Sequence, residues 1–576
     1  MLKKIVQRTV DYQRDQLGDL DSVLKRIYLS RDIYTPQSLD YSLTQLPSPS
    51  LLSGMTTMVS ALTTALSEQR KILIVADFDA DGATSCSVAM RGLRLLGAQH
   101  VSYLVPNRFK YGYGLTPEIV ALAAQSKPDI IITVDNGISS LEGVESAQKA
   151  GIDVLITDHH LPGEILPAAQ AIVNPNLIDD QFPSKALAGV GVIFYVLLAL
   201  RAELRSNKWF TKNKISQPNL AQLLDLVALG TVADVVPLDH VNRILVHQGL
   251  LRIKAGRGCS GINSLIKISG RQQKNLSATD LGFAIAPRLN AAGRLDDMAL
   301  GIECLLTSDA AHSEAMAQQL DQLNKERKEI ESDMKQSAMT ILASLPEDNL
   351  NATAPALCLY DQHWHQGVIG ILASRIKDKI NRPVIAFAQA DNGQLKGSAR
   401  SITPIHIRDV LNDIATQQPQ LLSKFGGHAM AAGLTIDSKD YTQFAQAFAK
   451  RTQQLLLNFD LTPQIYTDGA LTEDYLTLAF TAQLTAAGPW GQKFPEPQFE
   501  GVFDVLQVRI VGEHHLKFVL RLPEGEKIID AIYFFIEQPE TWLGVRQIKA
   551  VYKLNSNEFR GQKTLQFILQ HISKIT

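Results

Sequence analysis

Short apolar runs alternate with longer amphipathic segments between residues 51 and 240, and several of the runs stop at an aspartate. The runs lie at residues 73–75, 101–105, 129–134 and 153–157, separated by helix-like segments at 83–96, 117–125 and 141–150. Short β-branched runs are typical of buried parallel strands, and their alternation with helices indicates a sheet covered on both faces. This pattern predicts an α/β domain.

The patterning divides the whole chain into five parts. We expect an N-terminal arm (1–50), the α/β domain (51–240), a helical extension with a long connector helix (241–350), a smaller second α/β domain (351–455) and a C-terminal domain (456–576). Charges at helical spacing over 308–345 favour one or two long connecting helices. Strand-like runs at 499–510, 515–522, 527–535, 547–554 and 564–571 predict a five-stranded barrel of the OB type.

Composition narrows the functional classes. The 576 residues carry a net charge of −2, so a polyanionic partner would have to be held by local patches. The four scattered cysteines include no CxxC pair, which favours a reducing compartment. The N-terminus lacks the apolar core of a signal peptide, and the longest uncharged stretch, Ala186–Leu200, is too short to span a bilayer. We therefore expect a soluble cytoplasmic protein.

Acidic and histidine side chains follow three of the predicted strands, in DFDADG (77–82), VDNG (134–137) and TDHH (157–160). Ligands of open α/β sheets bind at the carboxyl ends of the strands, so we expect these side chains to converge at one edge. Several carboxylates at such close range cannot all stay ionised without a cation. The sequence therefore predicts a site for two or more divalent metal ions.

DFDADG also matches the start of an EF-hand calcium loop. That loop needs glutamate at its twelfth position, which here is Val88, and it follows a helix, whereas residues 71–76 resemble a strand. An ordinary acidic turn is the other alternative. The recurrence of acidic strand ends in this chain favours a metal site over both.

Spacing suggests a role for each side chain of the site. Asp77 and Asp79 point to the same side of an extended segment and face the metals, while Gly82 allows a tight turn into the next helix. Asp81 would orient these two carboxylates from outside the metal shell. Asp135 is placed to bridge two metals, with a turn-forming role for Asn136-Gly137 as the structural alternative.

The adjacent histidines are expected to point apart and to do different work. His159 is assigned to a metal, and His160 to a phosphate oxygen or to protonation of a leaving group. Asp234 follows a helix-like segment and needs a partner, either a metal or a helix cap. A metal-ligand set that consists mostly of carboxylate oxygens, with imidazole nitrogen in addition, suits Mn²⁺ or Mg²⁺. We count Asp135, Asp158 and His160 as catalytic.

Motifs that combine glycine with a cationic side chain are the candidates for binding the phosphate groups of a substrate. Glycines let backbone N–H groups approach phosphate oxygens, and arginine adds a bidentate fork, although each motif alone is more often a simple turn. The candidate phosphate-binding residues are Arg108 in VPNRFKYGYG, Arg288 in APRLNAAGR, Ser398 and Arg400 in LKGSARS, and His428 in GGHAMAAG.

The chain resembles the DHH phosphoesterase superfamily in four motifs that occur in this order: DFDADG, VDNG, DHH and GTVADVVPL. A later motif, GGHAMAAG, is similar to the signature of the superfamily's DHHA1 domain. Three further segments resemble one branch of this superfamily, the RecJ single-stranded-DNA exonucleases: VPNRF, APRLNAAGRLDD and WHQGVIGILASRIK. The resemblance implies a metal-dependent 5′-to-3′ exonuclease that releases mononucleotides in recombination and repair, including mismatch repair. It implies a monomer that meets a single-strand binding protein and a helicase.

The same resemblance implies residue roles by motif match. Metal ligands would be Asp77, Asp79, Asp135, His159 and Asp234; His160 would contact the scissile phosphate; Arg108, Ser398 and Arg400 would bind the 5′-phosphate; and Arg288 and His428 would hold backbone phosphates. Small-molecule phosphatases of the superfamily carry a histidine where this chain has Leu73. That departure fits the RecJ branch and bears on the occupancy of one metal site.

Three other functions are compatible with parts of the pattern. A superfamily enzyme that hydrolyses short oligonucleotides or cyclic dinucleotides would not need a C-terminal barrel. A non-catalytic DNA- or helicase-binding relative would have lost metal ligands, whereas every motif acid is present here. A general nucleotide-binding protein would carry a G-x-G-x-x-G or P-loop after the first strand, and this chain does not.

Overall fold

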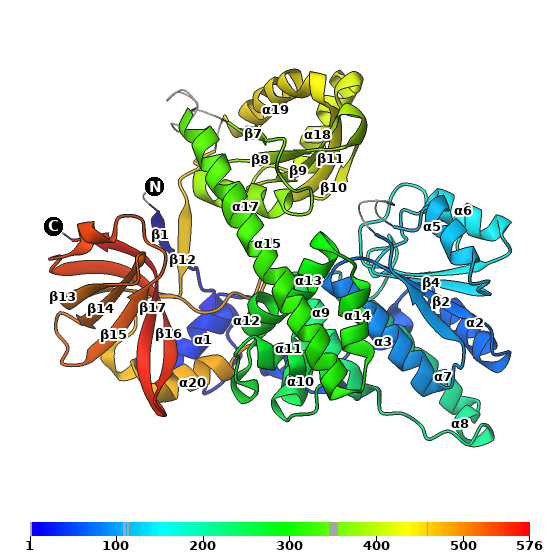
Figure 1. Ribbon diagram of the computed structural model, residues 1–576. Coiled ribbons are helices and arrows are strands. Elements are labelled where there is room, and N and C mark those ends of the chain that lie inside the picture. The colour runs from blue at the N-terminus through cyan, green and yellow to red at the C-terminus, as the bar shows by residue number, and fades with distance from the viewer. Residues whose placement is uncertain (1–2, 108–110, 112–113, 345–354, 458, 576) are drawn as a thin grey trace. The chain divides into compact units, whose positions relative to one another are not determined.

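The four apolar runs of the first α/β domain form parallel strands, and a fifth strand that was not predicted joins them, giving the order β3-β2-β4-β5-β6. Figure 1 labels the two central strands, β2 and β4. The computed structural model describes residues 3–107, 111, 114–344, 355–457 and 459–575. The strands are β2 (Ile72–Ala76), β3 (Val101–Leu104), β4 (Ile130–Val134), β5 (Asp153–Thr157) and β6 (Ala171–Val173). Every residue of β2 and β4 is buried, as expected for central strands covered on both faces.

Helices cover both faces of this sheet. One face, which carries Leu73, Ile131 and Val154, packs on α5 (Pro117–Ala124) and α6 (Leu141–Lys149). The other face packs on α2 (Met55–Ser67), α3 (Ala80–Leu96) and α7 (Gly189–Ser206). Further helices extend this unit: α9 (Leu224–Ala233), α10 (His240–Lys254), α11 (Ser260–Ile268), α13 (Ala286–Leu295) and α14 (Ala299–Leu306).

The C-terminal strands close into a barrel in the order β13-β14-β15-β17-β16. They are β13 (Phe499–Val511), β14 (His515–Arg521), β15 (Ile528–Tyr533), β16 (Gln547–Phe559) and β17 (Gln562–Lys574). Only β15 and β17 pair in parallel. Leu516, Phe518 and Leu520 of β14 fill the interior, alternating with partly exposed residues. The predicted barrel is confirmed.

The chain divides into two units, and the parallel sheet and the barrel belong to the same one, which comprises residues 5–293, 298–318 and 464–576. The N-terminal segment expected to be an arm contributes helix α1 (Ser22–Leu29), whose Tyr28 hydroxyl donates to the Ala487 carbonyl at 3.0 Å. In the described part of the chain, no helix is long and apolar enough to cross a membrane.

The other unit comprises residues 1–4, 294–297 and 319–463. Its mixed sheet has the order β10-β11-β9-β8-β7, with strands β7 (Leu357–Tyr360), β8 (Val384–Gln389), β9 (Gln394–Arg400), β10 (Lys424–Gly427) and β11 (Ala431–Asp437). The helix α17 (Ile369–Ile380) and part of α15 (Ala310–Ser344) pack on one face, and α18 (Ile407–Gln417) and α19 (Tyr441–Leu456) on the other. The predicted long helix is therefore the 35-residue α15, and the predicted fold class is confirmed.

Candidate metal centre and phosphate-binding residues

The acidic motifs meet where the order of the parallel strands reverses. The chain leaves β2 toward β3 on one side and leaves β4 toward β5 on the other, so the crevice of this sheet opens between the carboxyl ends of β2 and β4. Asp77 directly follows β2, and Asp135 directly follows β4. Asp158 follows β5, the next strand along the edge. The predicted convergence of these side chains is confirmed.

The DFDADG segment turns from strand to helix within three residues. Asp79 caps helix α3, and its carboxylate accepts hydrogen bonds from the N–H groups of Asp81 at 2.9 Å and Gly82 at 3.0 Å. A Cβ at Gly82 would lie 2.3 Å from the Asp77 carbonyl oxygen, so the expected tight turn requires glycine. The turn brings Asp77 and Asp79 to within 4.8 Å of Asp135.

Asp135 sits in a strained and confined position. Its φ of +62° is in the left-handed region, which non-glycine residues seldom adopt and which concentrates at functional sites. Only 2% of the residue is exposed. A Cβ on Gly189 would lie 2.6 Å from the carboxylate Oδ1 of Asp135, so the absence of a side chain at the start of α7 makes room for this carboxylate.

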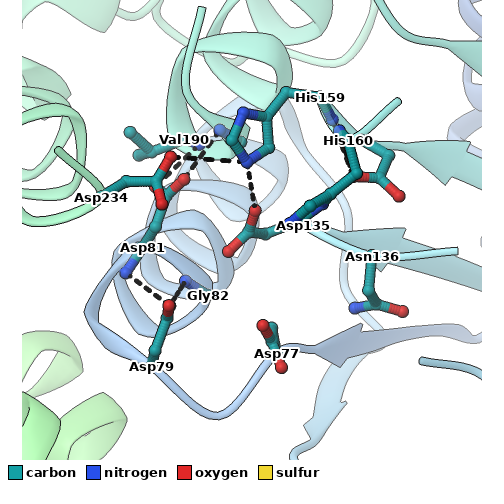
Figure 2. Close-up of polar contacts among 12 residues, drawn as sticks. Asp77, Asp79, Asp81, Gly82, Asp135, Asn136, His159, His160, Val190 and Asp234 are labelled. Atoms are coloured by element: carbon teal, nitrogen blue, oxygen red, sulfur yellow. Dashed lines mark hydrogen bonds and ion pairs between the residues drawn. The ribbon is translucent and has the colours of Figure 1, made fainter. Parts of the chain in front are cut away.

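The two histidines of the DHH motif do not point apart as predicted. Their ring centroids lie 4.5 Å apart, because the chain turns after β5 instead of continuing extended. Their polar partners differ all the same. His159 Nε2 lies 3.1 Å from Asp135 Oδ1 and 3.5 Å from Asp234 Oδ2, whereas His160 Nδ1 lies 2.7 Å from Asp158 Oδ1. Figure 2 shows His159 directed at the space that these acids surround.

Asp234 and Asp81 complete this space from two helices. Asp234 ends helix α9, and the next residue, Val235, also has a left-handed φ of +62°. Asp81 accepts hydrogen bonds from the N–H groups of Gly189 at 2.7 Å and Val190 at 3.1 Å, at the start of α7. Asp81, His159 and Asp234 offer ligand atoms within 4.8 Å of one another. Asp81 therefore lies closer to the cluster than an orienting role alone requires.

The crowding of these carboxylates shows in their pKa values. Burial, followed by the charges of neighbouring aspartates, raises the pKa of both Asp135 and Asp234 well above the ordinary range. Burial and the charge of Asp79 raise the pKa of Asp81 to about 7. A set of carboxylate oxygens with one imidazole nitrogen, held at ligand spacing, fits a hard divalent cation, and such a cation would relieve this repulsion.

His160 is held as a cation. Burial alone would lower its pKa, but the hydrogen bond and charge of Asp158, with the charges of Asp77 and Asp79, outweigh burial and raise the pKa to about 9. Conversely, burial would raise the pKa of Asp158, but its contacts with His160 dominate and lower that pKa. A protonated imidazole next to the acidic crevice is suited to meet a phosphate oxygen.

The predicted phosphate-binding residues fall in different places. Arg108 lies outside the described residues. Arg288 lies on α13 and donates to the Ala284 carbonyl one helical turn earlier. Its motif is therefore helical and not the simple turn that was given as the alternative. The glycine serves close packing, since a Cβ at Gly293 would lie 1.9 Å from the Phe78 carbonyl oxygen.

Ser398 and Arg400 lie on strand β9, so LKGSARS is also not the simple turn that was given as the alternative. Their side chains meet, with Arg400 Nη1 3.1 Å from Ser398 Oγ. Both reach the first turn of α17, since a Cβ on Gly370 would lie 2.9 Å from each of these two groups. His428 lies in the turn between β10 and β11, and β11 begins opposite Arg400.

Three asparagines at the same sheet edge have roles that the sequence reasoning did not predict, although it named Asn136 as part of a turn. The Asn136 amide donates to the carbonyls of Val75 and Val134, joining the ends of β2 and β4. Asn174 and Asn176, after β6, donate to the carbonyls of the two DHH histidines. The only available signal was their position after strand-like runs, because asparagine after a strand also marks an ordinary turn.

Comparison with known proteins places this site in a class. Residues 71–231 match the N-terminal domain of the DHH family, and residues 353–454 match the DHHA1 domain. The chain therefore combines a DHH domain, which holds the acidic crevice, with a DHHA1 domain, which holds Ser398, Arg400 and His428. Residues 467–571 match the RecJ OB domain, which includes the closed barrel.

Similarity over nearly the full length gives the particular family. The chain is 48% identical to the single-stranded-DNA-specific exonuclease RecJ of Escherichia coli over 98% of both chains, and 50% identical to that of Dickeya dadantii over 96% of both. The structure of Thermus thermophilus RecJ with Mn²⁺ superposes with a TM-score of 0.78 at 30% identity, covering 96% of this chain and 76% of that one. A Mg²⁺ complex of the same protein gives 0.74. This chain belongs to the RecJ family, as its motifs indicated.

Proposed function

We propose that this protein is a metal-dependent exonuclease that degrades single-stranded DNA from its 5′ end and releases mononucleotides. The observation that carries the proposal is the convergence of five ligand-bearing side chains at the switch point of the sheet, in a chain whose relatives are named single-stranded-DNA-specific exonucleases. The proposed ligands are Asp77, Asp79, Asp135, His159 and Asp234, with Asp135 as the bridge between two ions.

Mn²⁺ or Mg²⁺, when bound, would supply Lewis-acid activation of water and of the scissile phosphate. The residues of the chain hold and orient the reactants. His160, cationic at neutral pH and fixed through Nδ1 by Asp158, meets a phosphate oxygen or protonates the departing group. Asp158 keeps the imidazole oriented, which is the role we propose for it as a catalytic-site residue. Asp81 holds the start of α7 against the crevice.

The DHHA1 unit would recognise the end of the strand. Ser398 and Arg400 meet at the first turn of α17, where backbone N–H groups and the helix dipole favour an anion. Arginine offers a fixed fork for the terminal 5′-phosphate. Arg288 and His428 would bind backbone phosphates further along the strand, and we retain Arg108 as a candidate for the 5′ end.

The proposal extends to the cellular setting. The four cysteines form no disulfide, which suits an enzyme in a reducing cytoplasm, and we propose that it acts there as a monomer. Recombination and repair, including mismatch repair, are the processes that supply single-stranded DNA ends. A single-strand binding protein and a helicase are the proposed protein partners, because both act on the same substrate.

A time course on end-labelled DNA tests the activity. With Mn²⁺ present, we expect mononucleotides from the 5′ end of single strands and no product from matched blunt duplexes. Release from the 3′ end would contradict the polarity. Digestion of dinucleotides but not of long strands would place the protein with superfamily enzymes that act on small substrates.

The end-recognition role is tested with Arg400→Ala on substrates that differ only at the 5′ end. We expect KM to rise about 10-fold or more on 5′-phosphorylated strands, because a bidentate charge-assisted contact is lost, and to change little on 5′-hydroxyl strands. Arg451→Ala, which removes a partly exposed ion pair with Asp413 in the same unit, is the control. An equal loss on both substrates would rule out the assigned role.

A further inference from the structure

The two DHH histidines are held by side chains rather than by the sheet. His159 and His160 lie beyond the end of β5, outside any strand or helix. Backbone N–H and C=O groups of a partly buried segment need partners. The four such groups of this pair find theirs on three side chains: Asp158, Asn174 and Asn176.

Asp158 takes the N–H side of the pair. Its Oδ1 accepts from the N–H groups of His159 at 2.7 Å and His160 at 3.1 Å, as well as from the His160 ring. Its Oδ2 accepts from the N–H of Ile138 at 2.9 Å, in the loop after β4. The carboxylate therefore ties the histidine pair to the neighbouring strand end that carries Asp135.

The asparagines take the carbonyl side. Asn176 Nδ2 donates to the His159 carbonyl at 2.6 Å, and Asn174 Nδ2 donates to the His160 carbonyl at 2.8 Å. Asn174 is fully buried, and its Oδ1 accepts from the N–H of Asn176 at 2.8 Å, which fixes its amide orientation. Both residues belong to the turn that follows β6.

This turn is anchored independently of the histidines. The Lys185 ammonium donates to the Pro175 carbonyl at 2.7 Å and to the Asp180 carbonyl at 2.7 Å. Asp180 is itself buried and accepts from the N–H groups of Ser53 and Phe182. The Asn174-Pro175-Asn176 turn is thus a fixed support and does not depend on the histidine pair for its own shape.

We propose that Asn174 and Asn176 are positioning residues that fix the His159 imidazole at the metal centre by holding the carbonyls of both histidines. The inference rests on the proposed function, because only a metal-dependent enzyme would have a metal ion for the His159 imidazole to bind. Rotation of the 159–160 peptide would move His159 Nε2 away from Asp135 and Asp234, now 3.1 and 3.5 Å away. Groups that orient metal ligands from outside the coordination shell commonly contribute ~10- to 100-fold to metal affinity or activity.

Asn176→Ala and Asn174→Asp test the proposal in the full-length protein. Asn176 is only half-buried, so its truncation should leave the protein folded. Asn174→Asp preserves shape and replaces the donor with an oxygen that repels the His160 carbonyl. We expect Mn²⁺ binding, followed by the electron paramagnetic resonance signal of free Mn²⁺, to weaken about 10-fold or more in each variant. We also expect kcat at limiting Mn²⁺ to fall while KM for DNA stays unchanged, with recovery at saturating Mn²⁺.

Asn263→Ala is the matched control, because the Asn263 amide holds the Gly258 carbonyl at 2.9 Å in a loop of the same unit away from the histidines. Its Mn²⁺ affinity should equal that of the wild type. Wild-type Mn²⁺ affinity and kcat in both asparagine variants would overturn the proposal. If the wild type binds Mn²⁺ but cleaves no DNA, the proposed function fails, and the binding comparison still decides the positioning role. A wild type that binds no Mn²⁺ overturns both.

Discussion

Asp135 combines several features that destabilise the metal-free fold. It combines a left-handed backbone, near-complete burial and a pKa raised by burial and by surrounding aspartates. Each of these destabilises the metal-free fold, and a bound divalent cation would offset the electrostatic part. Asparagine at this position keeps the size and tolerates a positive φ, while it removes the charge.

For Asp135→Asn we therefore expect opposite effects on activity and stability. Cleavage of single-stranded DNA should fall by at least ~100-fold, because the proposed metal centre loses one of its carboxylate ligands. In EDTA, the free energy of unfolding should rise, because the substitution removes a buried charge whose pKa is raised by burial and by the surrounding aspartates. Urea unfolding and a nuclease assay on the same preparation measure both. A variant that is less stable and still active would show that Asp135 is a structural residue.

At the residue scale, the sequence predicts some members of the site and misses others for a physical reason. Asp77, Asp135 and Asp158 follow apolar runs, so their shared edge was predictable from strand order alone. Asn174 and Asn176 act through hydrogen bonds to carbonyls 14 and 17 residues earlier, and no periodicity encodes such a contact. The contact between the histidine rings likewise depends on a turn that follows β5 and not on spacing along an extended chain.

Elements were predictable where one pattern dominates. The buried runs of β2, β4 and β5 and the alternation within β14 have the periods of parallel and barrel strands. The glycine motifs were misread because glycine serves close packing as well as turns. In β9, a Cβ on Gly397 would lie 2.6 Å from the Phe387 ring, so this glycine belongs to a packed strand.

The start of α7 depends on such a close approach. Gly189 is its first residue, and a Cβ there would lie 2.6 to 2.8 Å from three atoms of the Asp135 side chain. We expect Gly189→Ala to destabilise the protein by about 1–3 kcal/mol through overpacking, and to weaken Mn²⁺ binding by displacing the carboxylate. Calorimetric titration with Mn²⁺ and thermal unfolding test this.

Gly163→Ala is the control for this substitution, since the added Cβ would have a nearest neighbour at 3.8 Å, an ordinary contact. It should retain wild-type Mn²⁺ affinity. If Gly189→Ala also retains it, the helix start does not set the position of Asp135.

At the scale of the whole molecule, the site makes stability depend on pH. The folded-state pKa of His160 is raised from 6.5 to about 9. The stabilisation that its protonated ring adds to the free energy of unfolding is therefore complete below pH 6.5 and is lost as the pH rises through 9. The raised pKa values of Asp81, Asp135 and Asp234 have the same sign, because the folded state favours their protonated forms. Without metal, both effects lower stability as the pH rises.

We expect the free energy of unfolding in EDTA to fall between pH 6.5 and 9, with His160 responsible for at most about 3 kcal/mol. His160→Gln should flatten the profile over this range. Saturating Mn²⁺ should reverse the trend, because metal binding requires deprotonated ligands. Urea unfolding at several pH values, with and without Mn²⁺, measures this. A flat profile in EDTA, or an unchanged slope in His160→Gln, would contradict the assignment.

The N-terminal segment and the region before the barrel are joined by a buried ion pair. Arg31 donates to both carboxylate oxygens of Asp468, at 2.6 and 3.0 Å, and both side chains are 1% exposed. Arg31 also donates to the carbonyls of Ile27 and Pro495. The pair links residues 437 positions apart in the sequence, so it closes the unit that contains both the catalytic sheet and the barrel.

Arg31→Ala should destabilise this unit by about 3–5 kcal/mol, because the buried carboxylate loses its two charge-assisted hydrogen bonds. Replacing both partners with apolar residues, Arg31→Met with Asp468→Leu, should restore most of that loss, since the buried carboxylate is removed together with its arginine and only the partly exposed Arg8 loses an ion-pair partner. Arg70→Ala, which breaks a partly exposed pair with Asp153, should cost less than ~1 kcal/mol. Urea unfolding of the four proteins tests the argument. A double variant as unstable as Arg31→Ala would show that the geometry of the pair, rather than the isolated charge, holds the two ends of the chain together.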